Sequence, residues 1–217
     1  MSSIAAVPAA PSRRRVLADV IARPSSRTRA LAVDTALILA GAAVVALLAQ
    51  VEIPLWPVPI TAQTLGVIIV GASLGAWRGA AALTTYMVLG LAGLPVFAGL
   101  TGSIVAVAKP SFGFVIGFIF AAFVAGWFAE RAWDRRPGLA FVGFAAASVV
   151  PFLFGVPYLA FVLNVGLGLD LTFWQILEAG LFPFIIGGLV KAAIAALLIP
   201  GAWALVRKVD AGKAKES

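Results

Sequence analysis

The sequence predicts an all-α integral membrane protein, a six-helix transmembrane bundle with both termini in the cytoplasm. Hydrophobic residues make up 62% of the 217-residue chain and charged residues only 12%, a balance that soluble domains do not show. Apolar stretches of about 20 residues recur, whereas an outer-membrane barrel would need short segments of alternating hydrophobicity. Positive charges gather between these stretches in a pattern that indicates orientation.

Six membrane spans follow one another along the chain. The expected spans are residues 31–51, 61–75, 79–94, 112–129, 139–165 and 181–206. The second and third are short for helices that cross a bilayer of ordinary thickness. The fifth contains Pro151 and Pro157, so we expect it to be kinked or broken.

Two polar tails flank the predicted six-helix domain of residues 31–206. Residues 1–30 are rich in Pro, Ser and Arg, which predicts a disordered cytoplasmic tail. A cleaved signal peptide would have a shorter apolar core and a cleavage site of small residues. Residues 207–217 form the second predicted cytoplasmic tail.

The distribution of cations supports this topology. All but two of the 16 Lys and Arg residues fall in its cytoplasmic segments; the exceptions are Lys109 outside and Lys191 within the membrane. This asymmetry follows the positive-inside rule and requires an even number of spans. The net charge of +7 therefore indicates topology, with attraction to membrane lipid, rather than a nucleic-acid partner.

The composition excludes several classes of chemistry. With no Cys and no His, the chain has no disulfide, catalytic thiol, His-ligated haem or usual zinc site. It also lacks a GxxxxGK[ST] loop, so it does not hydrolyse ATP by the P-loop route. We expect no cofactor, no metal and no catalytic residues.

Two segments on the outer side predict a roofed pocket. Residues 51–66 contain three prolines, which forbid a continuous helix, and they carry Trp56 and Gln63. Residues 93–113 are rich in glycine and carry Thr101. Irregular backbone at membrane depth is tolerated when it is buried in protein or lines a cavity. The alternative to a pocket is a tight turn whose tryptophan lies at the membrane interface.

Lys191 is the strongest candidate for a ligand-binding residue. A lysine at the centre of a membrane helix costs roughly 2.5–3.5 kcal/mol on insertion scales. Snorkelling to the interface is the alternative, but about ten residues of helix span roughly 15 Å, which exceeds the reach of the side chain. A cation without an acidic partner one turn away favours an anionic ligand.

Three further polar residues are candidates for the same cavity. They are Tyr86 on the third span and Tyr158 and Asn164 on the fifth. Each is equally suited to a hydrogen bond between helices, which is the commoner role of such residues in a bundle.

Small residues four apart on the first span predict a docking face for a partner helix. The candidates are Ala36, Ala40, Ala42 and Ala46. Small side chains let two helices approach closely. Because alanine is abundant throughout the chain, chance is the alternative explanation.

Several stretches resemble one known family. They are "IPLWPVPITAQTLG", "GLAGLPVFAG", "GFVIGF", "GWFAER" and "PFIIGGLVKA". Over about residues 33–206 the chain resembles BioY, the biotin-binding S component of energy-coupling factor (ECF) transporters. The resemblance implies a six-helix protein of a bacterial cytoplasmic membrane that captures biotin from outside. It also implies docking, through the small-residue face of the first helix, onto a transmembrane coupling subunit with two ATPase subunits.

The resemblance departs from the family pattern beside Lys191. The family often has a Gly-Asp-x-x-Lys pattern on the last helix, in which both polar groups contact biotin. Here Gly188 stands at the position of the aspartate. Another group, such as Asn164, Gln63 or loop backbone, would have to bind the ureido ring.

The sequence is also compatible with two other functions. The missing aspartate is consistent with an S component for another small vitamin. An intramembrane enzyme acting on lipid, with Lys191 and Glu178 as acid and base, is a remote alternative, because the sequence lacks a close carboxylate pair.

Overall fold

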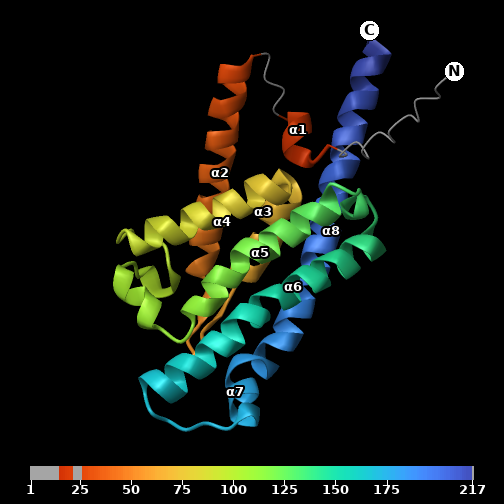
Figure 1. The fold of residues 1–217 in the computed structure, drawn as a ribbon. Helices are drawn as coiled ribbons and strands as arrows, with labels where there is room; N and C mark the ends of the chain where they lie inside the picture. Colours follow the sequence, from red (N-terminus) through yellow and green to blue (C-terminus); the bar gives the residue numbers. More distant parts are fainter. Residues whose placement is uncertain (1–14, 22–25, 217) are drawn as a thin grey trace, which may run out of the picture.

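The computed structural model describes residues 15–21 and 26–216, and most of them are helical (Figure 1). The α-helices are α1 (Leu17–Ile21), α2 (Arg27–Ala49), α3 (Gln63–Leu74), α4 (Ala76–Leu91), α5 (Phe112–Ala129), α6 (Pro137–Ala160), α7 (Phe173–Gly180) and α8 (Phe182–Glu216). Short elements join them: β1 (Glu52–Ile53), β2 (Ile60–Thr61), the 3₁₀ turns η1 (Ala98–Leu100), η2 (Ile104–Ala108) and η3 (Trp133–Arg135), and the π-helical turn η4 (Phe161–Gly166).

The helix α5 occupies the centre of the bundle, against α3, α4 and α6. Glycines bring these helices close together. A Cβ on Gly71 of α3 would lie 2.3 Å from the carbonyl oxygen of Ala122, and one on Gly117 would lie 2.6 Å from the Cα of Pro151. Such close approach maximises van der Waals packing between helices in lipid, where apolar burial gives no driving force.

Each of the six predicted spans overlaps one helix, namely α2, α3, α4, α5, α6 or α8. Within the described residues, four helical stretches are long and apolar enough to cross a membrane: Arg27–Ala49, Phe112–Ala129, Pro137–Gly166 and Phe173–Val209. The helix α3 is apolar but has only 12 residues. The fold is therefore a helical membrane bundle.

The fifth predicted span is not broken at its prolines. The helix α6 runs through Pro151 and Pro157 to Ala160 and continues as the π-helical turn. A proline removes one backbone hydrogen bond, but packing by neighbouring helices allows a membrane helix to tolerate this loss. Here Gly117 of α5 provides a flat surface against the backbone of Pro151.

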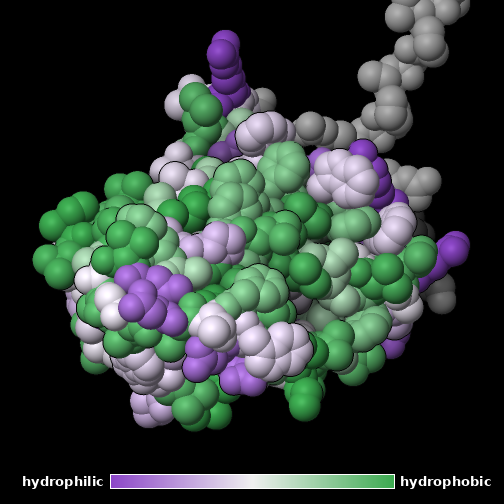
Figure 2. All heavy atoms as spheres, turned by 60° about the horizontal axis from the view of Figure 1, so that its bottom comes forward, coloured by the Kyte–Doolittle hydropathy of each residue, from purple (hydrophilic) through white to green (hydrophobic). Residues whose placement is uncertain are grey.

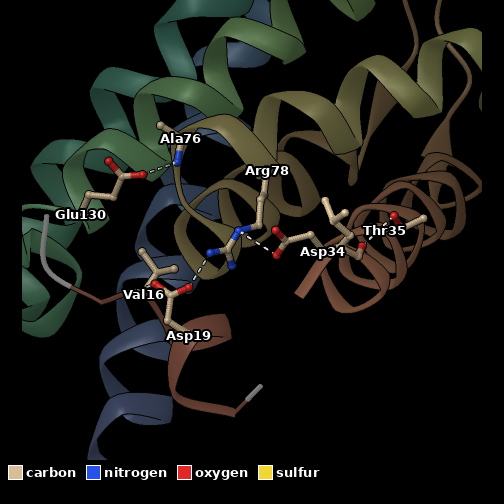
Figure 3. Close-up of polar contacts among 8 residues, drawn as sticks. Val16, Asp19, Asp34, Thr35, Ala76, Arg78 and Glu130 are labelled. Carbon is tan, nitrogen blue, oxygen red and sulfur yellow. Dashed lines mark hydrogen bonds and ion pairs between the residues drawn. The ribbon is translucent and has the colours of Figure 1, made fainter. Parts of the chain in front are cut away.

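Part of the predicted N-terminal tail is folded, contrary to the expectation of disorder. Residues 15–21 include α1, and Val16, Leu17 and Ala18 are buried. Arg78 at the start of α4 forms ion pairs with this segment and with α2 (Figure 3). Its guanidinium nitrogens lie 2.5 Å from Asp19 Oδ1 and 3.4 Å from Asp34 Oδ1. The remainder of the tail prediction, residues 1–14 and 22–25, lies outside the described residues.

The two ends of the bundle differ in character. The start of α2 and the end of α8 lie at one end, together with α1, whereas the β1–β2 hairpin and α7 lie towards the other (Figure 1). At the hairpin end, Gln50 ties α2 to the loop after α4. Its Nε2 donates to the carbonyl oxygen of Phe97 (3.2 Å), and its Oε1 accepts from the backbone N–H of Leu100 (2.9 Å).

Asp134 in η3 is a fully buried carboxyl group at the end that holds α1. Its Oδ2 accepts a hydrogen bond from Trp203 Nε1 of α8 at 2.5 Å. The guanidinium of Arg135 lies 4.3 Å from the centre of the Trp203 ring and donates to the backbone oxygen of Arg15 at 3.0 Å. Burial raises the pKa of Asp134 to about 6, although the Trp203 hydrogen bond and the Arg135 charge oppose the increase.

This shift predicts a pH-dependent stability that Asp134→Asn removes. Because the folded state holds the Asp134 proton more tightly than the unfolded state, the free energy of unfolding should fall as pH rises from about 4 to about 6. Thermal unfolding in detergent, measured across this range, should show that the variant gains stability relative to the parent as pH rises. Parallel stability profiles would contradict the assignment to Asp134.

Candidate functional site

The two irregular segments, residues 51–66 and 93–113, line one cavity of about 340 Å³, as the sequence predicts. Its wall is largely apolar and rich in aromatic rings, including Phe112, Phe114, Phe118, Phe152 and Phe184. The ionisable and amide side chains that line it are Glu52, Gln63, Tyr86, Lys109 and Lys191. Figure 2 brings this end of the molecule forward and shows a few hydrophilic side chains among hydrophobic ones.

Lys191 projects from α8 to the hairpin. Its Nζ donates to the carbonyl oxygen of Thr61 at 2.6 Å. Thr61 pairs with Glu52, while the backbone hydrogen bond beside them joins Ala62 to Val51. Thr61 and Glu52 therefore form a non-hydrogen-bonded pair, in which the carbonyl groups point away from the partner strand. This geometry leaves the Thr61 oxygen free to accept from the lysine.

Gln63 and Tyr86 continue the polar wall next to Thr61. The Thr61 hydroxyl donates to Gln63 Oε1 at 3.1 Å, and Gln63 Nε2 donates to the Tyr86 hydroxyl at 2.6 Å. Both side chains are buried. The Tyr86 ring also packs edge-on against Phe97 of the loop after α4, with centroids 5.4 Å apart. The chain of hydrogen bonds fixes these groups at the cavity surface.

Trp56 and Thr101 line the cavity from the two irregular segments. The Trp56 side chain is exposed, and Thr101 accepts a hydrogen bond from Lys109 Nζ at 3.2 Å. The site predicted from the sequence omits Glu52, which also lines the cavity. Its pairing with Thr61 puts both side chains on one face of the hairpin, a relation that the sequence does not reveal without the register.

Tyr158 and Asn164 are not brought to the cavity with the other candidates. The Tyr158 hydroxyl donates to the carbonyl oxygen of Val107 in η2. The Asn164 amide makes two hydrogen bonds with the backbone of Leu171, at 2.9 and 2.8 Å. Both side chains hydrogen-bond to the backbone of connecting segments, which is the structural role that the sequence left open for them.

Gly188 lines the cavity with free space around it. A Cβ added there would meet no heavy atom within 4 Å. Glu178, by contrast, is exposed on α7 and does not line the cavity. Lys191 and Glu178 are therefore not assembled into an acid–base pair.

The four alanines proposed for docking do not share one surface. Ala36 and Ala40 are exposed on α2, Ala42 is buried at 3% exposure, and Ala46 is half-buried against the core. Ala42 belongs to the buried hydrophobic core rather than to the exposed surface of α2. The prediction that Ala42 belongs to the same docking face is therefore wrong for this structure.

Comparison with known proteins establishes the family. The model of the BioY family matches residues 21–208. The chain belongs to the BioY family. A biotin transporter BioY of Rhizobium etli is 42% identical over 171 residues, covering 76% of this chain and 88% of the relative. One from Rhodobacter capsulatus is 38% identical over 168 residues, covering 74% and 87%.

A solved structure supports the fold. It is a crystal structure of the S-component for biotin from an ECF-type ABC transporter, with a TM-score of 0.59 and 24% sequence identity. The match covers 82% of this chain and 93% of that one. The two chains therefore share a fold over most of their length.

The hydrogen bond between Gln63 and Tyr86 predicts unequal effects of the same substitution at the two tyrosines. Tyr86→Phe should lower the free energy of unfolding by about 1–3 kcal/mol, because the buried Gln63 amide loses its acceptor. Tyr158→Phe is the matched control and should cost less, because its hydrogen bond to Val107 is exposed to solvent. Thermal unfolding without ligand measures both, and equal losses would contradict the prediction.

Proposed function

We propose that this protein captures biotin on the outer side of the membrane as the substrate-binding S component of an ECF transporter. The observation that carries the proposal is the cavity under the two outer segments, with Lys191 and a polar wall at its edge. The choice of biotin as the substrate rests on the relatives, which are named as biotin transporters.

The chemistry of biotin suits this cavity. Biotin has a carboxylate, an apolar valeryl chain and a fused ring system with a ureido group that carries two N–H donors and a carbonyl. A mostly apolar pocket with a few well-placed polar groups is the usual receptor for such a ligand. The proposed ligand contacts are Lys191, Gln63, Tyr86, Trp56 and Thr101, all of which line the cavity.

We also propose that six helices cross a bacterial cytoplasmic membrane, with both tails, residues 1–30 and 207–217, in the cytoplasm. The cation distribution supports this topology. The common end of the α2 start and the α8 end is consistent with an even number of crossings (Figure 1). In this topology α3 and α4 are short spans that share the bundle core with α5.

The proposed partners are a transmembrane coupling subunit with two ATPase subunits, and the surrounding lipid. Ala36 and Ala40 give α2 a small-residue face that a helix of the coupling subunit can approach closely. The chain itself has no P-loop, so the energy for release of the substrate would come from the ATPase subunits.

An S component for another small vitamin is the second candidate. The empty space at Gly188 favours it, because the position lines the cavity without contributing a polar group. A direct comparison of ligands by the purified protein separates the two functions. Binding of biotin at micromolar concentration or below, with weaker binding of other vitamins, supports the first; absence of biotin binding overturns it.

Lys191→Ala should weaken biotin binding about tenfold or more, because the charge-assisted hydrogen bond that we propose between this cavity-lining lysine and the ligand is lost. Isothermal titration of the detergent-solubilised protein measures the change. Lys208→Ala removes an exposed cation of α8 outside the cavity and should leave the affinity unchanged. Unchanged affinity in Lys191→Ala would refute the site while leaving the family assignment intact.

A bulky residue on the docking face should block uptake but not capture. Ala36→Trp should leave biotin binding by the purified protein unchanged and reduce uptake of labelled biotin by cells that contain the ATPase module, because the partner helix can no longer approach. Leu197→Trp is the control on an exposed position of α8. Equal uptake by both variants would argue against this face.

A further inference from the structure

Glu52 is a carboxylate in the cavity for which the fold supplies no partner. It belongs to β1 and lines the cavity beside Thr61. Within the described residues, the Glu52 carboxylate makes no hydrogen bond or ion pair, whereas Lys191, Gln63 and Tyr86 are all hydrogen-bonded to the protein. A charged acceptor in a mostly apolar cavity is therefore left for a ligand.

The hairpin register orients Glu52 towards the other polar groups. In a non-hydrogen-bonded antiparallel pair, the two side chains stand close together on the same face. The Glu52 side chain therefore lies beside that of Thr61, which starts the hydrogen-bonded chain to Gln63 and Tyr86. Lys191 meets the same hairpin through the Thr61 carbonyl.

The negative charge of Glu52 determines whether it can face the ureido end or the carboxylate end of biotin. A carboxylate accepts hydrogen bonds and donates none, and a second carboxylate beside it would be repelled. The ureido group is the part of biotin that offers N–H donors. We propose that Glu52 accepts a hydrogen bond from a ureido N–H of biotin and is a specificity-determining residue of this site. This inference rests on the proposed function, since it requires that biotin occupies the cavity.

Three ligands test the proposal with Glu52→Gln, which keeps the size of the side chain and removes its charge. The ligands are biotin, 2-iminobiotin, whose ring is a cationic guanidinium at neutral pH, and biotinol, which has an alcohol in place of the carboxylate. Dissociation constants are measured for the full-length protein and the variant in detergent.

The proposal makes a different prediction for each ligand. Glu52→Gln should weaken biotin on the order of tenfold, and biotinol by the same factor, because the carboxyl end does not face Glu52. It should weaken 2-iminobiotin by a larger factor, because an ion pair is lost as well. Unchanged biotin affinity would overturn the proposal. So would tighter binding of biotin with no change for biotinol, which would show that Glu52 faces the carboxylate end.

Controls separate a local effect from misfolding and from failure of the function. Glu178→Gln changes an exposed carboxylate on α7 outside the cavity and should leave all three affinities unchanged. Glu52→Ala is a second variant of the same site, expected to lose at least as much biotin affinity as Glu52→Gln. If the unaltered protein binds none of the three ligands, the proposed function fails; if it binds biotin and both Glu52 variants bind it equally well, only the role of Glu52 fails.

Discussion

The need to satisfy every backbone polar group without water governs this structure. Helices meet that need internally, so most of the described residues are helical. The irregular backbone before α3 and between α4 and α5 is stabilised by its own contacts, including the Glu52–Thr61 pairing, the Phe97–Thr101 bridge and the Gln50 side chain. Because both segments end at the same side of the bundle, they jointly line one cavity.

Lys191 connects the β1–β2 hairpin to the helical bundle. Its hydrogen bond to the Thr61 carbonyl joins α8 to the hairpin across 130 residues of sequence. The same hairpin presents Glu52, and its Thr61 hydroxyl begins the bonded chain through Gln63 to Tyr86. A cation, a carboxylate and a polar wall therefore line an aromatic pocket, and the proposed biotin site rests on this arrangement.

Different parts of the protein were predictable from the sequence to different degrees. The bounds of α5 agree with the predicted span because a wholly apolar run has clear ends. The folding of residues 15–21 was not predicted, since the burial of Val16, Leu17 and Ala18 depends on the surface formed by distant helices and on the ion pair between Arg78 and Asp19. The exposed and buried sides of α2 were also not separable, because alanines occur all around the helix. The Asn164 side chain hydrogen-bonds to the backbone of Leu171, a contact that hydrophobic periodicity does not reveal.

By itself, the sequence determined the class of the protein, the helical segments and the cost of placing Lys191 in the membrane, because these depend on local composition and length. The tertiary structure alone decided which polar groups share the cavity. Hairpin register placed Glu52 beside Thr61, helix packing brought Lys191 to the same hairpin, and loop contacts kept Tyr158 and Asn164 away. These relations join residues far apart in the chain, so they exist only once the bundle is packed.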